Sequence, residues 1–187
     1  MKRVLITIAA LLMLAIGNGQ NVQFGVKAGV NLATLSGDVS DLDSRFSFHL
    51  GAVAEIPLSE VFSVQPELLY SGQGFKAGDD VVKLDYINLP IMAKYYVADG
   101  FSIEAGPQIG YMLSAKSEID DEGDVGYEYQ LFDFGVNIGL GYKPNSELNL
   151  GIRYNWGLAS IVNWFDEFFN DEKISNSVLQ ISIGYNF

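Results

Sequence analysis

Apolar residues recur at every second position along most of this 187-residue chain. The alternation is regular in residues 22–32, 46–56, 62–70, 101–113, 132–142, 148–158 and 178–187. Because successive side chains of a β-strand point to opposite faces, each apolar row lies on one face of a strand. These segments therefore predict strands rather than helices.

Residues 81–97, VVKLDYINLPIMAKYYV, predict one more strand with a less regular pattern. Its alternation shifts near Tyr86–Asn88, and the row after the shift contains Ile87, Leu89 and Ile91. We expect a β-bulge at the shift, because an inserted residue reverses the side-chain alternation. Pro90 cannot donate a ladder hydrogen bond, which adds to the expected irregularity.

The predicted connections alternate in length along the chain. Residues 57–60, 98–100 and 143–146 are short and contain the turn-forming residues Pro, Gly, Asp and Asn. The other connections, about 34–45, 73–81, 116–128 and 159–176, are longer and more polar. This order predicts an antiparallel up-and-down sheet with both termini on the short-turn side.

The apolar rows could face either a soluble core or lipid. In a soluble sandwich or lipocalin-like barrel the apolar face is inside. The polar rows of this chain, however, are rich in glycine and poor in charge, whereas a solvated face favours Lys and Glu. Aromatic residues also gather at the strand ends, as in the two interfacial girdles of membrane barrels. They are Phe62, Phe101, Tyr142 and Phe187 near the short turns, and Phe46, Tyr70 and Trp156 near the long connections.

Strands of about 10–12 residues suit a tilted bilayer crossing, so we place the apolar rows toward lipid. In lipid every backbone group must be paired, so the sheet must close. The predicted fold class is all-β: a closed eight-stranded antiparallel up-and-down transmembrane β-barrel. Eight strands leave a lumen filled by its own side chains.

A polar network is expected in this lumen, with carboxylates facing basic side chains, because a buried charge without a partner is costly. Glycines in the polar rows should make room for these longer side chains. The predicted members are Lys27, His49, Glu55, Glu67, Lys94, Glu104, Asp133 and Arg153.

The N-terminus predicts a secretory signal peptide. Lys2 and Arg3 precede a short apolar run from Val4 to Gly17, and small residues follow near Gly19. The run is shorter than the roughly 20 residues of a membrane-spanning helix, which disfavours an uncleaved anchor. We therefore divide the chain into a signal peptide, residues 1–20, and a barrel domain, residues 21–187.

Composition excludes several function classes. A net charge of −12 disfavours nucleic-acid binding, which needs clustered Lys and Arg. The absence of cysteine excludes disulfides and thiolate metal sites. We predict no cofactor and no metal site.

Five segments resemble a known family. They are GVKAGVNLATLSGD (25–38), HLGAVAEIPLSEVFSVQPELLYSGQGFK (49–76), YINLPIMAKYYV (86–97), FSIEAGPQIGYML (101–113) and LNLGIRYNWGL (148–158). Together they are similar to the outer-membrane β-barrel domain family common in Bacteroidetes, also described as porin-family or PorT-like proteins. The resemblance implies a Gram-negative outer-membrane barrel.

The last strand predicts an assembly signal. Leu179, Ile181, Ile183, Tyr185 and Phe187 form an apolar row that ends on an aromatic residue. Outer-membrane proteins commonly finish in this way, and the barrel assembly machinery is thought to read the pattern. We therefore expect two partners, outer-membrane lipid and that machinery.

Two features are candidates for chemical sites. His49 has Ser47 nearby, with Asp38, Asp41 and Asp43 in the preceding connection, but a triad is recognised by geometry, so catalysis is not expected. The acidic residues Asp120, Asp121, Glu122 and Asp124 could bind Ca²⁺, but they lack a regular ligand spacing. A solvated acidic loop is the preferred interpretation.

Residues 163–172, NWFDEFFNDE, permit a short amphipathic helix. Its apolar positions would be Trp164, Phe165, Phe168 and Phe169, and it would cap the barrel mouth or contact a ligand.

The predicted function is a monomeric scaffold that displays four surface loops, whose partner the sequence does not identify. The alternative is a narrow channel for small solutes or cations, with Glu55, Glu67, Glu104 and Asp133 favouring cations. A membrane-lipid-modifying enzyme is a more distant alternative.

Overall fold

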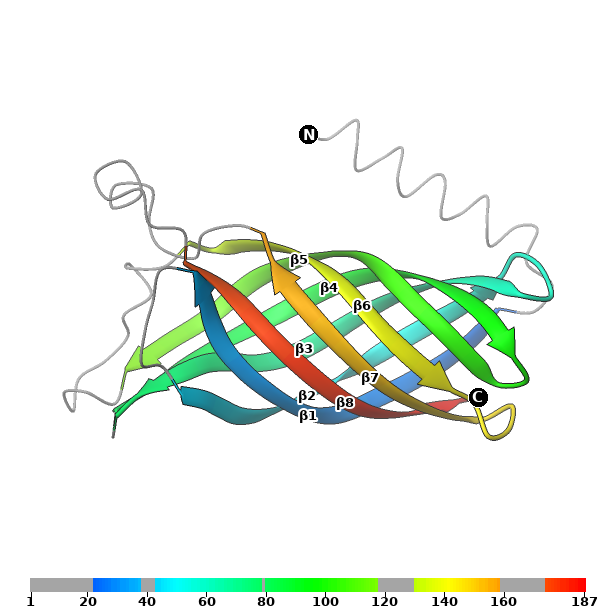
Figure 1. The fold of residues 1–187 in the computed structure, drawn as a ribbon, viewed down its shortest axis with the longest axis horizontal. Coiled ribbons are helices and arrows are strands. Elements are labelled where there is room, and N and C mark those ends of the chain that lie inside the picture. Colours follow the sequence, from blue (N-terminus) through cyan, green and yellow to red (C-terminus); the bar gives the residue numbers. More distant parts are fainter. Residues whose placement is uncertain (1–21, 38–42, 79, 118–129, 159–173) are drawn as a thin grey trace, which may run out of the picture.

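The computed structural model describes residues 22–37, 43–78, 80–117, 130–158 and 174–187. These residues form one closed antiparallel barrel in which each strand pairs with the next and β1 pairs with β8 (Figure 1). The strands are β1 (Gln23–Gly37), β2 (Asp43–Pro57), β3 (Phe62–Ala77), β4 (Asp80–Ala98), β5 (Phe101–Ser117), β6 (Phe132–Tyr142), β7 (Leu148–Gly157) and β8 (Ile174–Asn186). The predicted fold class is confirmed.

The first and last strands close the barrel over their whole length. Their register runs from Gly25 opposite Asn186 to Gly37 opposite Ile174. The backbone N–H of Phe187 also donates to the carbonyl of Phe24 at 2.8 Å. Within the described residues, no helix has the length and hydrophobicity needed to cross a membrane.

Apolar side chains cover the outside of the barrel and polar side chains fill its inside. On β6, Ile138 is 61% exposed, whereas its neighbour Asn137 is fully buried. On β7, Ile152 is 45% exposed and Arg153 only 4%. This is the reverse of a soluble barrel, as the alternation with glycine-rich polar rows predicts.

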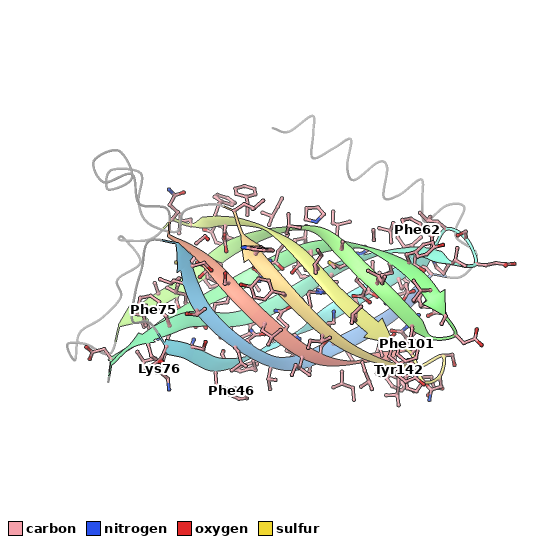
Figure 2. The ribbon with its side chains drawn as sticks, in the orientation of Figure 1. Phe46, Phe62, Phe75, Lys76, Phe101 and Tyr142 are labelled. Atoms are coloured by element: carbon pink, nitrogen blue, oxygen red, sulfur yellow. The ribbon has the colours of Figure 1, made fainter. Side chains whose placement is uncertain are left out.

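Aromatic rings lie near both ends of the apolar surface. Figure 2 shows Phe62, Phe101 and Tyr142 near the short-turn end and Phe46 toward the opposite end. The rings of Phe101 and Tyr142 stack with centroids 4.3 Å apart. At the long-connection end the rings of Tyr111 and Phe132 meet edge to face at 5.3 Å.

Three of the four predicted long connections are shorter than expected, because the strands continue into them. The largest difference is at residues 73–81, where β3 continues to Ala77 and β4 begins at Asp80. The remaining turn contains Gly78, whose φ of +64° suits glycine. Two others are shortened because β1 reaches Gly37, β2 begins at Asp43 and β8 begins at Ile174. The connection between β5, which ends at Ser117, and β6, which begins at Phe132, is not shortened.

The prediction of an alternation shift within β4 was wrong. Even-numbered residues of β4 face inward along the strand, from Val82 through Asn88 to Lys94. A register shift does occur between β4 and β5, but the extra residue is Leu113 on β5, between Met112 opposite Tyr86 and Ser114 opposite Asp85.

The side chains of β4 keep their alternating directions, but the polarity of its two faces is exchanged along the strand. Toward the long-connection end, the inward residues Val82, Leu84 and Tyr86 are buried and apolar. With Met112 and Ala115 they form a buried cluster, which we call the apolar plug. On the opposite face of this part of β4 lie Lys83 and Asp85. A strand that leaves lipid for water would show this change, since its outer surface must become polar.

Candidate functional site

Glu67 on β3 is the centre of an ion-pair network in the lumen. The guanidinium of Arg153, on β7, donates to both Glu67 carboxylate oxygens at 2.9 Å. The ammonium of Lys27, on β1, lies 3.0 Å from the same carboxylate. Two parallel hydrogen bonds from arginine are a strong and directional form of pairing, so this contact fixes β7 against β3 across the lumen.

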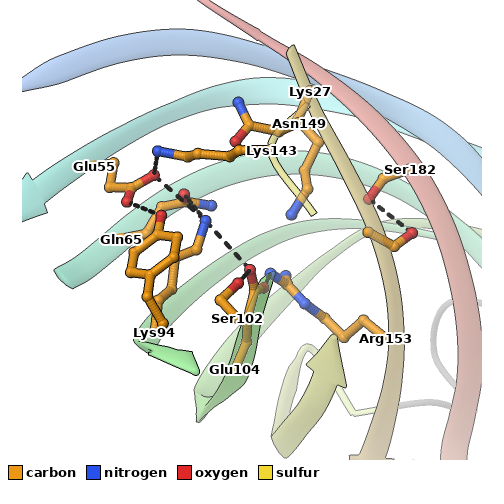
Figure 3. Close-up of polar contacts among 12 residues, drawn as sticks. Lys27, Glu55, Gln65, Lys94, Ser102, Glu104, Lys143, Asn149, Arg153 and Ser182 are labelled. Carbon is orange, nitrogen blue, oxygen red and sulfur yellow. Dashed lines mark hydrogen bonds and ion pairs between the residues drawn. The ribbon is translucent and has the colours of Figure 1, made fainter. Parts of the chain in front are cut away.

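Two further carboxylates extend the network toward the short turns. Figure 3 shows Lys94 of β4 between Glu55 of β2 and Glu104 of β5, at 3.3 Å and 3.2 Å. Lys143, in the turn between β6 and β7, lies 2.7 Å from Glu55. Arg153 reaches Glu104 at 3.3 Å and so joins the two halves of the network.

Buried polar side chains complete the hydrogen bonding of these charges. Gln65 donates to Glu67 at 2.7 Å and accepts from Lys94 at 3.1 Å. The Tyr96 hydroxyl donates to Glu55. A buried ion pair is tolerated only when its remaining donors and acceptors are satisfied, and these bonds meet that condition.

The network contains four cations and three carboxylates. Its members are Lys27, Glu55, Glu67, Lys94, Glu104, Lys143 and Arg153. The predicted preference of a channel for cations assumed unpaired carboxylates in the lumen. Because the three network carboxylates are paired with cations, that preference does not follow from the network.

One lumen glycine leaves the space that the network needs. A Cβ on Gly141 of β6 would collide with the Glu104 carboxylate and the Ser102 hydroxyl. The glycine-rich polar rows therefore serve packing here, as expected.

Little open space remains beside the network. A cavity of about 30 Å³ is lined by Lys27, Lys94, Lys143, Gln65, Ser102 and Asn149, among others. A cavity needs about 10–15 Å³ to hold one water molecule, so this one admits about two or three at most. At the position of the ion-pair network, the lumen of the described barrel is therefore closed.

His49 lies outside the ion-pair network. Its Nδ1 is 2.7 Å from the Asn31 side-chain oxygen, which also accepts from Gln180 at 3.3 Å. Its Nε2 has no hydrogen-bond partner. Among the described residues, neither Ser47 nor any carboxylate is hydrogen-bonded to the ring, so they form no Ser-His-acid arrangement.

Asp133 also faces the lumen but takes part in no ion pair of the described residues. It accepts a hydrogen bond from Asn176 at 3.0 Å. Of the eight predicted network residues, six are joined by ion pairs, and His49 and Asp133 stand apart.

Sequence reasoning missed Lys143 and Gln65. Lys143 lies in the KPNS segment, which reads as a solvated turn, and only the closed barrel shows its side chain directed inward. Gln65 lies two residues before Glu67 on the same strand, so the alternation could have predicted that its side chain faces the lumen.

Two predicted loop features lie outside the described residues. They are the acidic group from Asp120 to Asp124 and the aromatic segment 163–172. In the part of the chain that the structure describes, no group of three or more His, Asp or Glu side chains is arranged to hold a metal ion.

Comparisons with solved structures show the same fold. Neisserial surface protein A is 15% identical and matches with a TM-score of 0.59 over 90% of this chain and 100% of its own. Ail, the attachment invasion locus protein of Yersinia pestis, is 12% identical, with a TM-score of 0.54 over 90% and 100% of the two chains. A major outer membrane protein from Thermus thermophilus is 13% identical, with a TM-score of 0.55 over the same shares.

A family model places the chain more firmly. In the comparison with curated proteins, no sequence matches this chain. The model described as "Outer membrane protein beta-barrel domain", however, matches residues 18–163, which is most of the chain. The chain is therefore an outer-membrane protein and belongs to the outer membrane protein beta-barrel domain family.

Proposed function

We propose that this protein is a non-catalytic, monomeric scaffold that holds its longer connections at the outer surface of the membrane. One observation carries the proposal: the ion-pair network occupies the lumen and leaves a cavity of only about 30 Å³. A closed lumen leaves the outer surface and the connections as the parts available to other molecules.

The proposed orientation places the short turns in the periplasm. The turns 58–61, 99–100 and 143–147 lie at the same end of the barrel as Asn186, the last residue of β8 (Figure 1). Barrels of this class have short periplasmic turns and longer extracellular loops. The polar outer face of β4 at the opposite end supports the same orientation.

The channel is the competing function, and a planar-bilayer recording separates the two. We expect no stable conductance steps from the purified protein, because the network crosses the lumen between strands. Reproducible unitary steps would contradict the scaffold proposal. If steps occurred, we would expect weak ion selectivity, because Asp133 and the three network carboxylates balance the four network cations, and reversal potentials in a salt gradient would measure it.

The enzymatic alternative has a direct test at His49. The scaffold proposal expects the same lipid A composition in cells producing the wild-type protein and His49→Ala. A lipid A modification present with the wild type and absent with His49→Ala would favour the enzyme.

Export and assembly are the remaining parts of the proposal. We assign residues 1–20 to a cleaved signal peptide, which N-terminal sequencing of the membrane-fraction protein would check. We assign recognition by the barrel assembly machinery to Leu179, Ile181, Ile183, Tyr185 and Phe187. The strongly exposed positions of Ile181, Ile183, Tyr185 and Phe187 on β8 and its end support that role.

We also place the protein in the PorT-like, Bacteroidetes branch of the family. The support is the sequence resemblance of segments such as YINLPIMAKYYV (86–97) and LNLGIRYNWGL (148–158).

A further inference from the structure

The basic residues of the described chain fall into two groups. One group belongs to the ion-pair network in the lumen: Lys27, Lys94, Lys143 and Arg153. The other group lies near the long-connection ends of four neighbouring strands: Arg45 on β2, Lys76 on β3, Lys83 on β4 and Lys116 on β5. Basic residues outside the network therefore gather on one side of the barrel, at one end (Figure 1).

The short turns at the other end carry the opposite charge. Glu60, Asp99 and Glu147 are exposed there, whereas Lys143, the basic residue of these turns, pairs with Glu55. The net charge of the chain is −12, so a local excess of basic residues at one end is not a consequence of composition.

Three of the lysines are neighbours in the sheet. Lys83 lies directly opposite Lys116, and opposed side chains have Cβ atoms about 4.5–5.5 Å apart. Lys83 also lies opposite Gly74, which makes Lys76 its diagonal neighbour at about 7–8 Å. We call Lys76, Lys83 and Lys116 the lysine patch.

The lysine patch faces outward. Leu84 and Ala115, the chain neighbours of Lys83 and Lys116, are fully buried on the inner face, so the two lysines point the other way. Lys76 is exposed, and Figure 2 shows it at the long-connection end of the barrel.

This arrangement attracts an anion. Like charges directly opposite one another are destabilising, and an anion between the two ammonium groups would offset their repulsion. In the part of the chain that the structure describes, no carboxylate forms an ion pair with Lys76 or Lys116, not even Asp43, which lies opposite Lys76. Asp85, on the same face of β4, accepts instead from two hydroxyl groups, at 2.9 Å and 3.2 Å.

The lysine patch lies where the outer surface changes from apolar to polar. On the outer face of β4, Leu89 is 46% exposed, and the face becomes polar at Asp85 and Lys83. On β5, Tyr111 and Leu113 are 44% and 53% exposed just before the patch. Basic side chains at such a level meet lipid headgroups, while the apolar residues meet acyl chains.

We propose that the lysine patch binds the phosphate groups of lipid A, the anionic glycolipid of the outer leaflet. Ammonium groups bind phosphate through charge-assisted hydrogen bonds, and the acyl chains of the same molecule would lie against the adjacent apolar surface. A soluble anion would use the lysines but not that surface. The proposal rests on the proposed orientation, in which the long connections lie at the outer surface.

Surface plasmon resonance on the immobilised full barrel in neutral detergent tests the proposal. The probes are diphosphoryl lipid A and the same lipid without its phosphates. We expect the wild type to bind the phosphorylated lipid at least fivefold more tightly. The affinity should also fall as NaCl is added, because salt screens exposed charges. Binding in detergent does not depend on orientation or conductance, so this test and those of the scaffold proposal can fail separately.

Paired variants locate the binding. Lys83→Gln/Lys116→Gln should weaken binding of diphosphoryl lipid A about twentyfold, since each basic residue near an anionic lipid contributes about fivefold. Lys83→Arg/Lys116→Arg keeps both charges and should bind within about twofold of the wild type. The matched control, Ser59→Asp/Ser146→Asp, lowers the net charge by the same two units in exposed short turns and should bind as the wild type does.

Three results would overturn the proposal. Equal affinity of the wild type for the two lipids would show that phosphate is not recognised. Equal weakening in the glutamine and aspartate variants would show that overall charge, not the lysine patch, controls binding. Displacement of lipid A by inorganic phosphate at equal concentration would assign the patch to a soluble anion. If the glutamine variant fails to fold, judged by its gel mobility before and after boiling, Lys76→Gln replaces it, with about a fivefold loss expected.

Discussion

At the scale of single residues, the barrel depends on charges that are buried together. Glu67 is within hydrogen-bond distance of Arg153, Lys27 and Gln65. Replacing a whole buried ion pair by apolar residues is often neutral, but removing one member leaves an uncompensated charge. Replacing the Glu67 carboxylate alone is therefore a better test of the network than replacing a whole ion pair.

Glu67→Gln should destabilise the folded barrel strongly. The substitution keeps the shape of the side chain but leaves Arg153 and Lys27 facing an uncharged amide. Breaking a buried pair in this way costs about 3–5 kcal/mol. Urea unfolding in lipid vesicles would measure the free energy of unfolding.

The exposed Glu60, in the turn between β2 and β3, provides the matched control. Glu60→Gln should change the free energy of unfolding by no more than about 0.5 kcal/mol, as is usual for surface sites. Equal losses in the two variants would show that the Glu67 contacts contribute little to stability.

At the scale of one strand, β4 crosses from lipid into water. Leu89 is 46% exposed on the outer surface, and Lys83 lies on the same face closer to the long-connection end. The reversal of polarity between these positions marks the expected membrane boundary near Asp85–Ile87.

Spin labels test this boundary directly. The chain has no cysteine, so Lys83→Cys and Leu89→Cys can each be labelled without background. In lipid vesicles the label at 89 should be relaxed mainly by oxygen and the label at 83 mainly by a water-soluble nickel complex. Similar accessibility at both positions would contradict the assigned boundary.

The same strand shows what the sequence can and cannot predict. Alternation indicated the faces of most strands correctly, because one side of each meets lipid along its length. Residues 73–81 read as a loop because glycine and charge are frequent there, yet β3 and β4 continue through them in water. Alternation interpreted for a strand in lipid therefore fails to predict the part of the same strand that lies in water.

At the scale of the whole molecule, closure brings together residues that no local pattern can pair. Arg153 and Glu67 lie on strands that are not neighbours, so their contact follows from the barrel's diameter and strand stagger. Sequence placed both residues in the lumen, but it could not give their partners. Lys143 was missed for the same reason, since only the closed lumen draws a turn residue inward.

The central claim is that the apolar surface of a closed barrel faces lipid while its charges are buried inside. Gel mobility of the purified protein in dodecyl sulfate, with and without boiling, tests it most directly. We predict that the protein needs detergent to stay in solution and that the unheated barrel migrates differently from the boiled chain. A protein that remains soluble without detergent, with one mobility before and after boiling, would contradict the account.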